Sequence, residues 1–158
     1  TVTGGKWTTY RAMAEDVLDK CREAGLLEVP RERPTRDLRL VGAGAPGASG
    51  AMATPLSQAP GLHGYGDEAD AVRALPGADR WLAEGLSEAM VRFAARHEYA
   101  RCVEDVLARR SRLLFLDARQ AAEAAPAVAR LLQEETGVDP RLADFEALAR
   151  RFTERPSA

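Results

Sequence analysis

The chain has 158 residues, of which 46% are hydrophobic and 29% are charged, a composition typical of a single globular domain. Its net charge of −2 at pH 7 argues against a nucleic acid partner, because such partners are bound by strongly basic surfaces. Its two cysteines, Cys21 and Cys102, are too few for a disulfide framework or a metal cluster, and they fit a reducing compartment such as the cytoplasm.

The first residues, Thr1-Val2-Thr3, are predicted to be the end of a β-strand. A strand at the very start of a chain, with no partner strand close behind it, suggests a piece of a longer protein. We therefore expect further chain upstream of Thr1.

The next stretch, from Gly4 to Thr9, has the composition of a ligand-binding turn. Gly4 and Gly5 have no Cβ atom, so the backbone can approach a ligand closely. Lys6 follows directly and can reach an anionic group. The hydroxyl of Thr8 or Thr9 can cap the helix that comes next. The alternative is a plain turn between a strand and a helix, with no ligand.

An amphipathic helix is predicted from about residue 9 to residue 24, with Gly25 as its left-handed stop. Its N-terminus would carry free N–H groups and partial positive charge, which suits an anion or an electron-rich ring edge. The apolar residues that share one face are Tyr10, Met13, Ala14, Val17, Leu18 and Cys21.

A flexible connector is expected at about residues 26–64, which prolines interrupt repeatedly. Leu38 to Val41 could form a short strand, and residues 42–47 match the pattern G-x-G-x-x-G. A dinucleotide site would need a long apolar helix after this pattern, whereas small residues, a glycine and a proline follow. We therefore interpret residues 42–47 as a surface loop.

The second half of the chain is predicted to be helical. Asp67 is expected to cap a short helix that stops at Pro76-Gly77, and Asp79 to begin a helical turn that holds Trp81 and Leu82. Longer helices are expected at 88–97 behind the N-cap Ser87, at 102–110, at 118–124, at 127–136 after Pro126, and from Asp139-Pro140 onward.

Other candidate chemistry in the sequence is weak. His97 to Arg101 departs from the zinc motif H-E-x-x-H because arginine replaces the second histidine, so we expect no metal site. We expect Arg109 and Arg110 to be structural rather than phosphate-binding. One of them can pair with Asp105 one helical turn away, and the other with an acid on a neighbouring helix.

Residues 4–11 read Gly-Gly-Lys-Trp-Thr-Thr-Tyr-Arg and lead into the predicted helix. Residues 96–113 are similar to the pattern R-x-E-x-A-x-T-x-x-D-x-L-x-R-R-T-R-L. Both stretches resemble one known family, the FAD-dependent glycerol-3-phosphate dehydrogenases. Cys102 and Ser111 depart from the threonines of that pattern, so the helix start at Cys102 is expected to be loose.

The resemblance implies the following organisation. Residues 1–11 would close an FAD-binding domain, and residues 12–158 would form the C-terminal α-helical domain. The fold would be mainly α, a compact bundle of short helices preceded by the last β-strand of the FAD-binding domain. The residues implied to lie near FAD are Gly4, Gly5, Lys6, Thr8 and Thr9, with Lys6 also near the substrate phosphate.

The resemblance also implies a reaction for the full-length protein. It would oxidise sn-glycerol 3-phosphate to dihydroxyacetone phosphate and pass electrons to quinone, at the periphery of the inner membrane. No catalytic residue is expected in this part of the chain, which would be inactive without the rest. The alternatives are an oxygen-using glycerol-3-phosphate oxidase and a non-catalytic helical module for interaction or homodimer formation.

Overall fold

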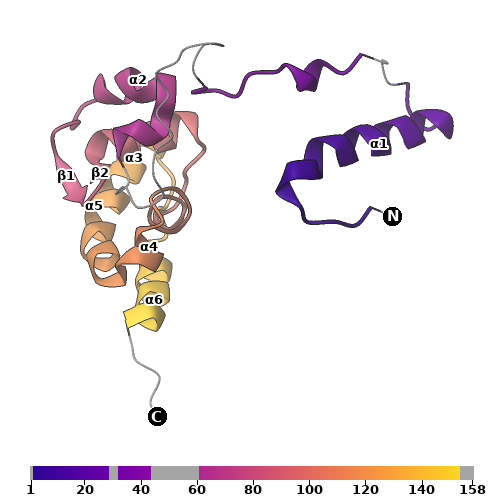
Figure 1. The fold of residues 1–158 in the computed structure, drawn as a ribbon. Coiled ribbons are helices and arrows are strands. Elements are labelled where there is room, and N and C mark those ends of the chain that lie inside the picture. The colour runs from indigo at the N-terminus through magenta and orange to yellow at the C-terminus, as the bar shows by residue number, and fades with distance from the viewer. Residues whose placement is uncertain (1, 29–31, 44–60, 154–158) are drawn as a thin grey trace. The chain divides into compact units, whose positions relative to one another are not determined.

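The computed structural model describes residues 2–28, 32–43 and 61–153 (Figure 1). The chain divides into two compact units, Thr1–Leu40 and Val41–Ala158. Each unit is described by itself below.

The first unit contains one long helix. A 3₁₀-helix, Trp7–Thr9, leads into α1, Tyr10–Glu23. The helix stops as predicted at Gly25, whose φ of 68° places it in the left-handed region. The N–H groups of Gly25 and Leu26 donate to the carbonyls of Arg22 and Cys21, which is the Schellman pattern of helix termination.

The strands predicted in this unit are absent from its described residues. Val2 and Thr3 belong to no strand, because no partner strand pairs with them among the described residues, and Thr1 lies outside them. The segment from Leu38 to Val41 is likewise not a strand. Before it lies a 3₁₀-helix, Pro34–Arg36, and residues 29–31 and 44–60 of the predicted connector lie outside the described residues.

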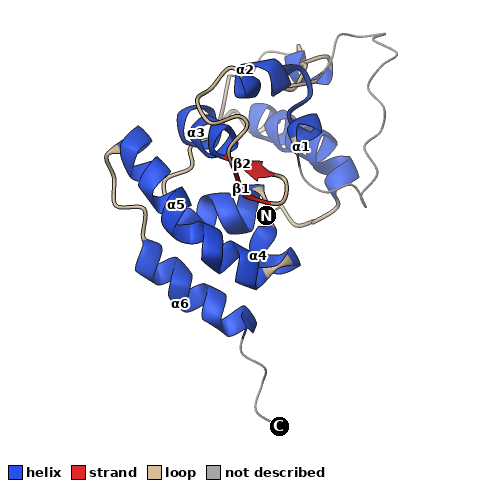
Figure 2. Cartoon of the chain, turned by 90° about the vertical axis from the view of Figure 1, so that its left-hand side faces the viewer, coloured by secondary structure: helices blue, strands red, loops and turns tan. Residues whose placement is uncertain are grey.

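The second unit is mainly helical, with one small hairpin (Figure 2). Its elements in chain order are a 3₁₀-helix Leu62–Glu68, α2 Ala69–Arg73, β1 Trp81–Ala83, β2 Leu86–Ser87, α3 Glu88–His97, a π-helix Asp105–Arg110, α4 Leu113–Leu116, α5 Ala118–Thr136 and α6 Leu142–Thr153. The prediction of a mainly α fold is therefore confirmed.

The helix at α2 begins later than the sequence suggested. Asp67 does not cap it, since the 3₁₀-helix runs through Glu68 and α2 starts at Ala69. The Asp67 N–H instead donates to the carbonyl of Gly42 at 3.1 Å. Gly77, at φ 85°, lies beyond the end of the helix, close to where the stop was predicted.

The helical turn predicted at Trp81 and Leu82 is wrong. These residues form β1, which pairs antiparallel with β2 around Glu84 and Gly85. Gly85 has a φ of 72°, a conformation that glycine adopts without steric cost. Ser87 then caps α3 as predicted, because its side chain accepts a hydrogen bond from the Met90 N–H.

The two helices predicted on either side of Pro126 are one helix, α5. Proline removes one intrahelical hydrogen bond and commonly breaks a helix at a cost of about 3 kcal/mol. Here Ala124, Ala125 and Val128 are buried on both sides of Pro126, so packing of the continuous apolar face outweighs that cost. Gly137, at φ 67°, ends the helix as predicted.

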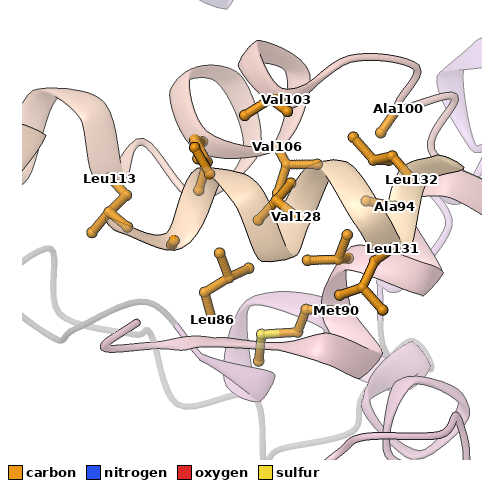
Figure 3. Packing of buried hydrophobic residues seen from close by; sticks show 14 of the residues in the cluster. Leu86, Met90, Ala94, Ala100, Val103, Val106, Leu113, Val128, Leu131 and Leu132 are labelled. Atoms are coloured by element: carbon orange, nitrogen blue, oxygen red, sulfur yellow. The ribbon is translucent and has the colours of Figure 1, made fainter. Parts of the chain in front are cut away.

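The core surrounds α5. Val128, Leu131 and Leu132 of this helix are fully buried. Figure 3 shows Val103 and Val106 on one side of α5, and Leu86 and Met90 on the other. Helices α3 and α6 also pack against α5, with Phe93 and Phe145 buried.

A cluster of ion pairs joins α3 to α5. Glu135 lies 2.5 Å from Arg92 and 2.6 Å from Arg96, measured between carboxylate oxygens and guanidinium nitrogens. Hydrogen bonds from Arg96 lower the pKa of Glu135, and those from Arg92 add to this against the opposing effect of burial. Glu134 is paired with Arg92 and Arg130 at the rim of the cluster.

Candidate functional site

The Gly-Gly-Lys turn, residues 4–6, contains one glycine that the backbone conformation requires and one that it does not. Gly4 has a φ of 153°, and a Cβ atom there would lie 2.6 Å from Cε of Met13. Gly5 differs, because a Cβ atom there would meet nothing within 4 Å. Within its own unit, Gly4 is thus required by its backbone conformation, since the flexible end of Met13 could move aside, whereas Gly5 leaves open space in front of the backbone.

Neither threonine caps the helix as predicted. Thr9 occupies the N-cap position of α1 but makes no capping hydrogen bond, and Thr8 lies inside the 3₁₀-helix. The Thr9 side chain instead points backward, and its hydroxyl donates to the Lys6 carbonyl at 3.1 Å. The N–H groups at the start of the helix therefore receive no side-chain acceptor.

Lys6 lies directly before the 3₁₀-helix that leads into α1, and no side chain caps the start of that helix either. Its residue is exposed, and within the described part of the chain its ammonium group forms no ion pair. The backbone at Lys6 is extended, with φ −86° and ψ 112°. A positive side chain and a helix N-terminus thus occupy neighbouring positions, an arrangement that attracts anions.

An apolar groove of about 690 Å³ runs from the turn along α1. It is lined by Trp7, Tyr10, Met13 and Val17 among others, as well as by the two glycines and Lys6. The apolar face predicted for the helix is thus present, but none of the residues of α1 is fully buried. Trp7 is 85% exposed and packs edge-to-face with Tyr10.

The opposite side of α1 is covered by charges of its own unit. Arg33 pairs with Glu15 and Asp19, each at 3.0 Å. Arg11 also pairs with Glu15 within the helix. The charged face is therefore neutralised inside the unit, whereas the apolar groove has no such cover there.

The second motif has a structural role. Burial alone would raise the pKa of Asp105, but hydrogen bonds from the N–H groups of Arg101 and Cys102 outweigh it, and the pKa is lowered. These bonds, at 2.9 and 3.1 Å, stabilise the start of the helix. The side chain of Cys102 cannot cap this start, because it has no hydroxyl group. Arg109 pairs with Asp105 as predicted, at 2.8 Å.

Arg110 pairs with Glu98, the residue directly after α3, at 3.2 Å. It also donates to the Asp105 carbonyl at 2.8 Å, at the start of the π-helix. A helix was predicted at 102–110, and in the structure its second part is a π-helix, since the Ser111 N–H donates to the carbonyl of Val106, five residues earlier. Both arginines are thus held by protein groups, which agrees with the structural role predicted for them.

A second cavity, of about 240 Å³, lies in the helical unit and was not predicted from the sequence. Its lining includes Tyr65, Leu86, Met90 and Arg110. Burial raises the pKa of Tyr65 to about 12, with a smaller contribution from Glu98. Tyr65 lies in a glycine-rich stretch with no periodic pattern, so no sequence signal pointed to it.

In the described part of the chain, no group of histidine, cysteine or acidic side chains could hold a metal ion. His97 packs against the ring of Phe93, with 4.6 Å between ring centroids. None of the helices formed by the described residues is long and apolar enough to cross a membrane.

Comparison with known families and proteins gives a consistent result. The family described as the C-terminal domain of alpha-glycerophosphate oxidase matches residues 33–142. The mitochondrial glycerol-3-phosphate dehydrogenase SDP6 of Arabidopsis thaliana is 36% identical, over 85% of this chain and 26% of its own length. The mitochondrial glycerol-3-phosphate dehydrogenase of Bos taurus is 33% identical, over 96% of this chain and 23% of its own length.

The corresponding protein of Homo sapiens is 32% identical, over 88% of this chain and 21% of its own length. The chain thus spans about a quarter of the length of these relatives. No solved structure matches it.

Proposed function

This chain belongs to the family of the C-terminal domain of alpha-glycerophosphate oxidase, and on that premise we propose that it is the C-terminal part of an FAD-dependent glycerol-3-phosphate dehydrogenase. The full-length protein oxidises sn-glycerol 3-phosphate to dihydroxyacetone phosphate. Support comes from relatives named glycerol-3-phosphate dehydrogenase that are similar over most of the chain. The alternative is a non-catalytic helical module for interaction or dimer formation.

The residues of the Gly-Gly-Lys turn fit a flavin. Gly5 leaves open space before the backbone, the N-terminus of α1 offers uncapped N–H groups, and Lys6 adds a positive charge without an ion pair among the described residues. Bound FAD would accept the hydride from carbon 2 of the substrate. The N–H groups and Lys6 would then stabilise the negative charge that develops on the reduced ring.

The apolar groove supports a domain assignment. Residues 1–11 would close the FAD-binding domain, and the helical domain would follow from residue 12. The open face of α1 would pack on the FAD-binding domain, because its apolar side chains have no cover within their own unit. The family match begins only at residue 33, which is consistent with an N-terminal segment that serves another domain.

Quinone is the proposed electron acceptor, with the full-length protein at the periphery of the inner membrane. The relatives are named dehydrogenases and mitochondrial, which favours this acceptor over oxygen. The family description names an oxidase, so oxygen is the rival acceptor.

Homodimer formation through the helical domain is a further proposal. The chain without the rest of the protein would be inactive and colourless.

The single observation that carries the proposed flavin site is Lys6 beside a helix N-terminus that no side chain caps. In the full-length protein, Lys6→Ala is expected to lower kcat/KM for glycerol 3-phosphate by about ten- to a hundredfold, because a hydrogen bond to a charged group is worth about 1.5–3 kcal/mol. The matched control is Lys20→Ala, which removes the only other lysine and its exposed pair with Glu23. Equal activity and flavin content in both variants would reject the site.

A further inference from the structure

Thr9 makes two hydrogen bonds to a single acceptor. Its backbone N–H and its side-chain hydroxyl both donate to the carbonyl oxygen of Lys6, each at 3.1 Å. The hydroxyl also lies 3.6 Å from Sδ of Met13. A hydroxyl has one proton to donate, and a carbonyl oxygen is a stronger acceptor than a thioether. The Thr9 hydroxyl therefore donates its proton to the carbonyl oxygen of Lys6 rather than to Met13.

Holding this carbonyl also orients the peptide group between Lys6 and Trp7. The described residues contain no cis peptide bond, so this group is planar and trans, and its N–H points opposite to its C=O. The carbonyl is drawn toward Thr9 and the body of the helix. The Trp7 N–H consequently points out of the N-terminal end, where helix N–H groups lack intrahelical partners.

Met13 connects the same contact to the glycine turn. Its Sδ lies beside the Thr9 hydroxyl, and its Cε occupies the space that a Cβ atom on Gly4 would need. Thr9, Met13 and Gly4 thus form one packed group behind the turn.

We propose that Thr9 is a positioning residue of the flavin site and does not itself contact the cofactor. The inference rests on the proposed function and deepens it. Thr9 holds the Lys6 carbonyl, and through it sets the direction of the Trp7 N–H and the start of the Lys6 side chain. The donor and the charge are then fixed before the anionic or electron-rich edge of the flavin arrives, so binding does not have to order them.

The test uses four variants of the full-length protein. Thr9→Val removes the hydroxyl at nearly constant shape, and Thr9→Ser keeps it. Thr153→Val is the matched control, because the Thr153 hydroxyl also donates to a carbonyl three residues earlier, that of Arg150, at 3.1 Å. Lys6→Ala reports on the proposed function itself. For each variant, the dissociation constant of FAD is measured by reconstitution of the apoprotein, together with KM and kcat.

Thr9→Val is expected to raise the FAD dissociation constant by about three- to tenfold, which corresponds to the loss of one ordinary hydrogen bond. Thr9→Ser should restore it to within about twofold, and Thr153→Val should leave it unchanged. If Thr9→Val binds FAD normally while Lys6→Ala does not, the inference is overturned and the proposed function stands. If Thr9→Ser is as impaired as Thr9→Val, the hydroxyl is not the cause, and the inference fails. If Thr9→Val and Lys6→Ala both bind FAD normally, the proposed flavin site is rejected together with the inference.

Discussion

Gly5 is expected to matter for FAD binding by the proposed full-length protein but not for the stability of this chain by itself. A side chain at Gly5 would meet nothing within 4 Å, so its own unit does not require glycine there. If FAD lies against this backbone, a Cβ atom would take up space that the cofactor needs. The two situations therefore predict different effects of one substitution.

Gly5→Ala is expected to leave the stability of this chain unchanged and to raise the FAD dissociation constant of the full-length protein at least about tenfold. The measurement is flavin content after gel filtration, with thermal unfolding of the chain alongside. Gly64→Ala is the control, since a Cβ atom at Gly64 also meets nothing within 4 Å. Normal flavin content in Gly5→Ala would place the cofactor elsewhere.

Single residues also show which features of the candidate site could be predicted from the sequence. The turn at Gly4 and Gly5, the charge at Lys6 and the helix behind them were all predictable from residue type and spacing. The direction of the Thr9 hydroxyl was not, because a 3₁₀-helix, Trp7–Thr9, precedes α1 and moves Thr9 away from a regular capping geometry. Sequence patterns for caps assume that the α-helix begins directly after the cap.

At the scale of the elements, the ion pairs between α3 and α5 govern how stability depends on pH. Hydrogen bonds from Arg96 are the largest cause that lowers the pKa of Glu135 below its ordinary value of 4.5. A lowered pKa in the folded state means that the stabilisation is present above the ordinary pKa. It is lost as the pH falls through the lowered value.

Glu135→Gln is expected to destabilise the chain by about 1.5–3 kcal/mol near neutral pH, since it removes charged hydrogen bonds to Arg92 and Arg96. The difference from the unmodified chain should shrink when the pH is brought from near neutral to below the lowered pKa of Glu135, where the carboxyl group becomes protonated in the folded chain as well. Urea unfolding at both pH values measures this. Glu123→Gln, an exposed substitution on the same helix, is the control. A difference that stays constant with pH would show that the charge of Glu135 contributes nothing.

The elements that the sequence failed to predict share a physical cause, which is tertiary packing. Trp81 and Leu82 form a strand because a partner strand lies across the tight turn at Gly85, and pairing is not visible in local propensity. Pro126 stays inside α5 because buried alanines and Val128 flank it. By contrast, the stops at Gly25 and Gly137 were predicted, since a left-handed residue ends a helix for local reasons.

At the scale of the whole molecule, the mainly helical fold was predictable. Periodic apolar residues and caps predicted most helices of the second unit. The boundary between Leu40 and Val41 lies within the stretch of about residues 26–64 that prolines interrupt, but nothing in the sequence marks this point inside that stretch. The open groove on α1 was also invisible to the sequence, because an amphipathic pattern predicts an apolar face but not what covers it.

The proposed activity belongs to the full-length protein, of which this chain would be the C-terminal part. Its most direct test is anaerobic addition of sn-glycerol 3-phosphate to the purified full-length protein while flavin absorbance is followed. We predict one FAD per chain and loss of the oxidised flavin spectrum on addition of substrate, with glycerol, which lacks the phosphate, as an inactive control. A full-length protein that carries no flavin, or whose flavin stays oxidised with glycerol 3-phosphate, would contradict it.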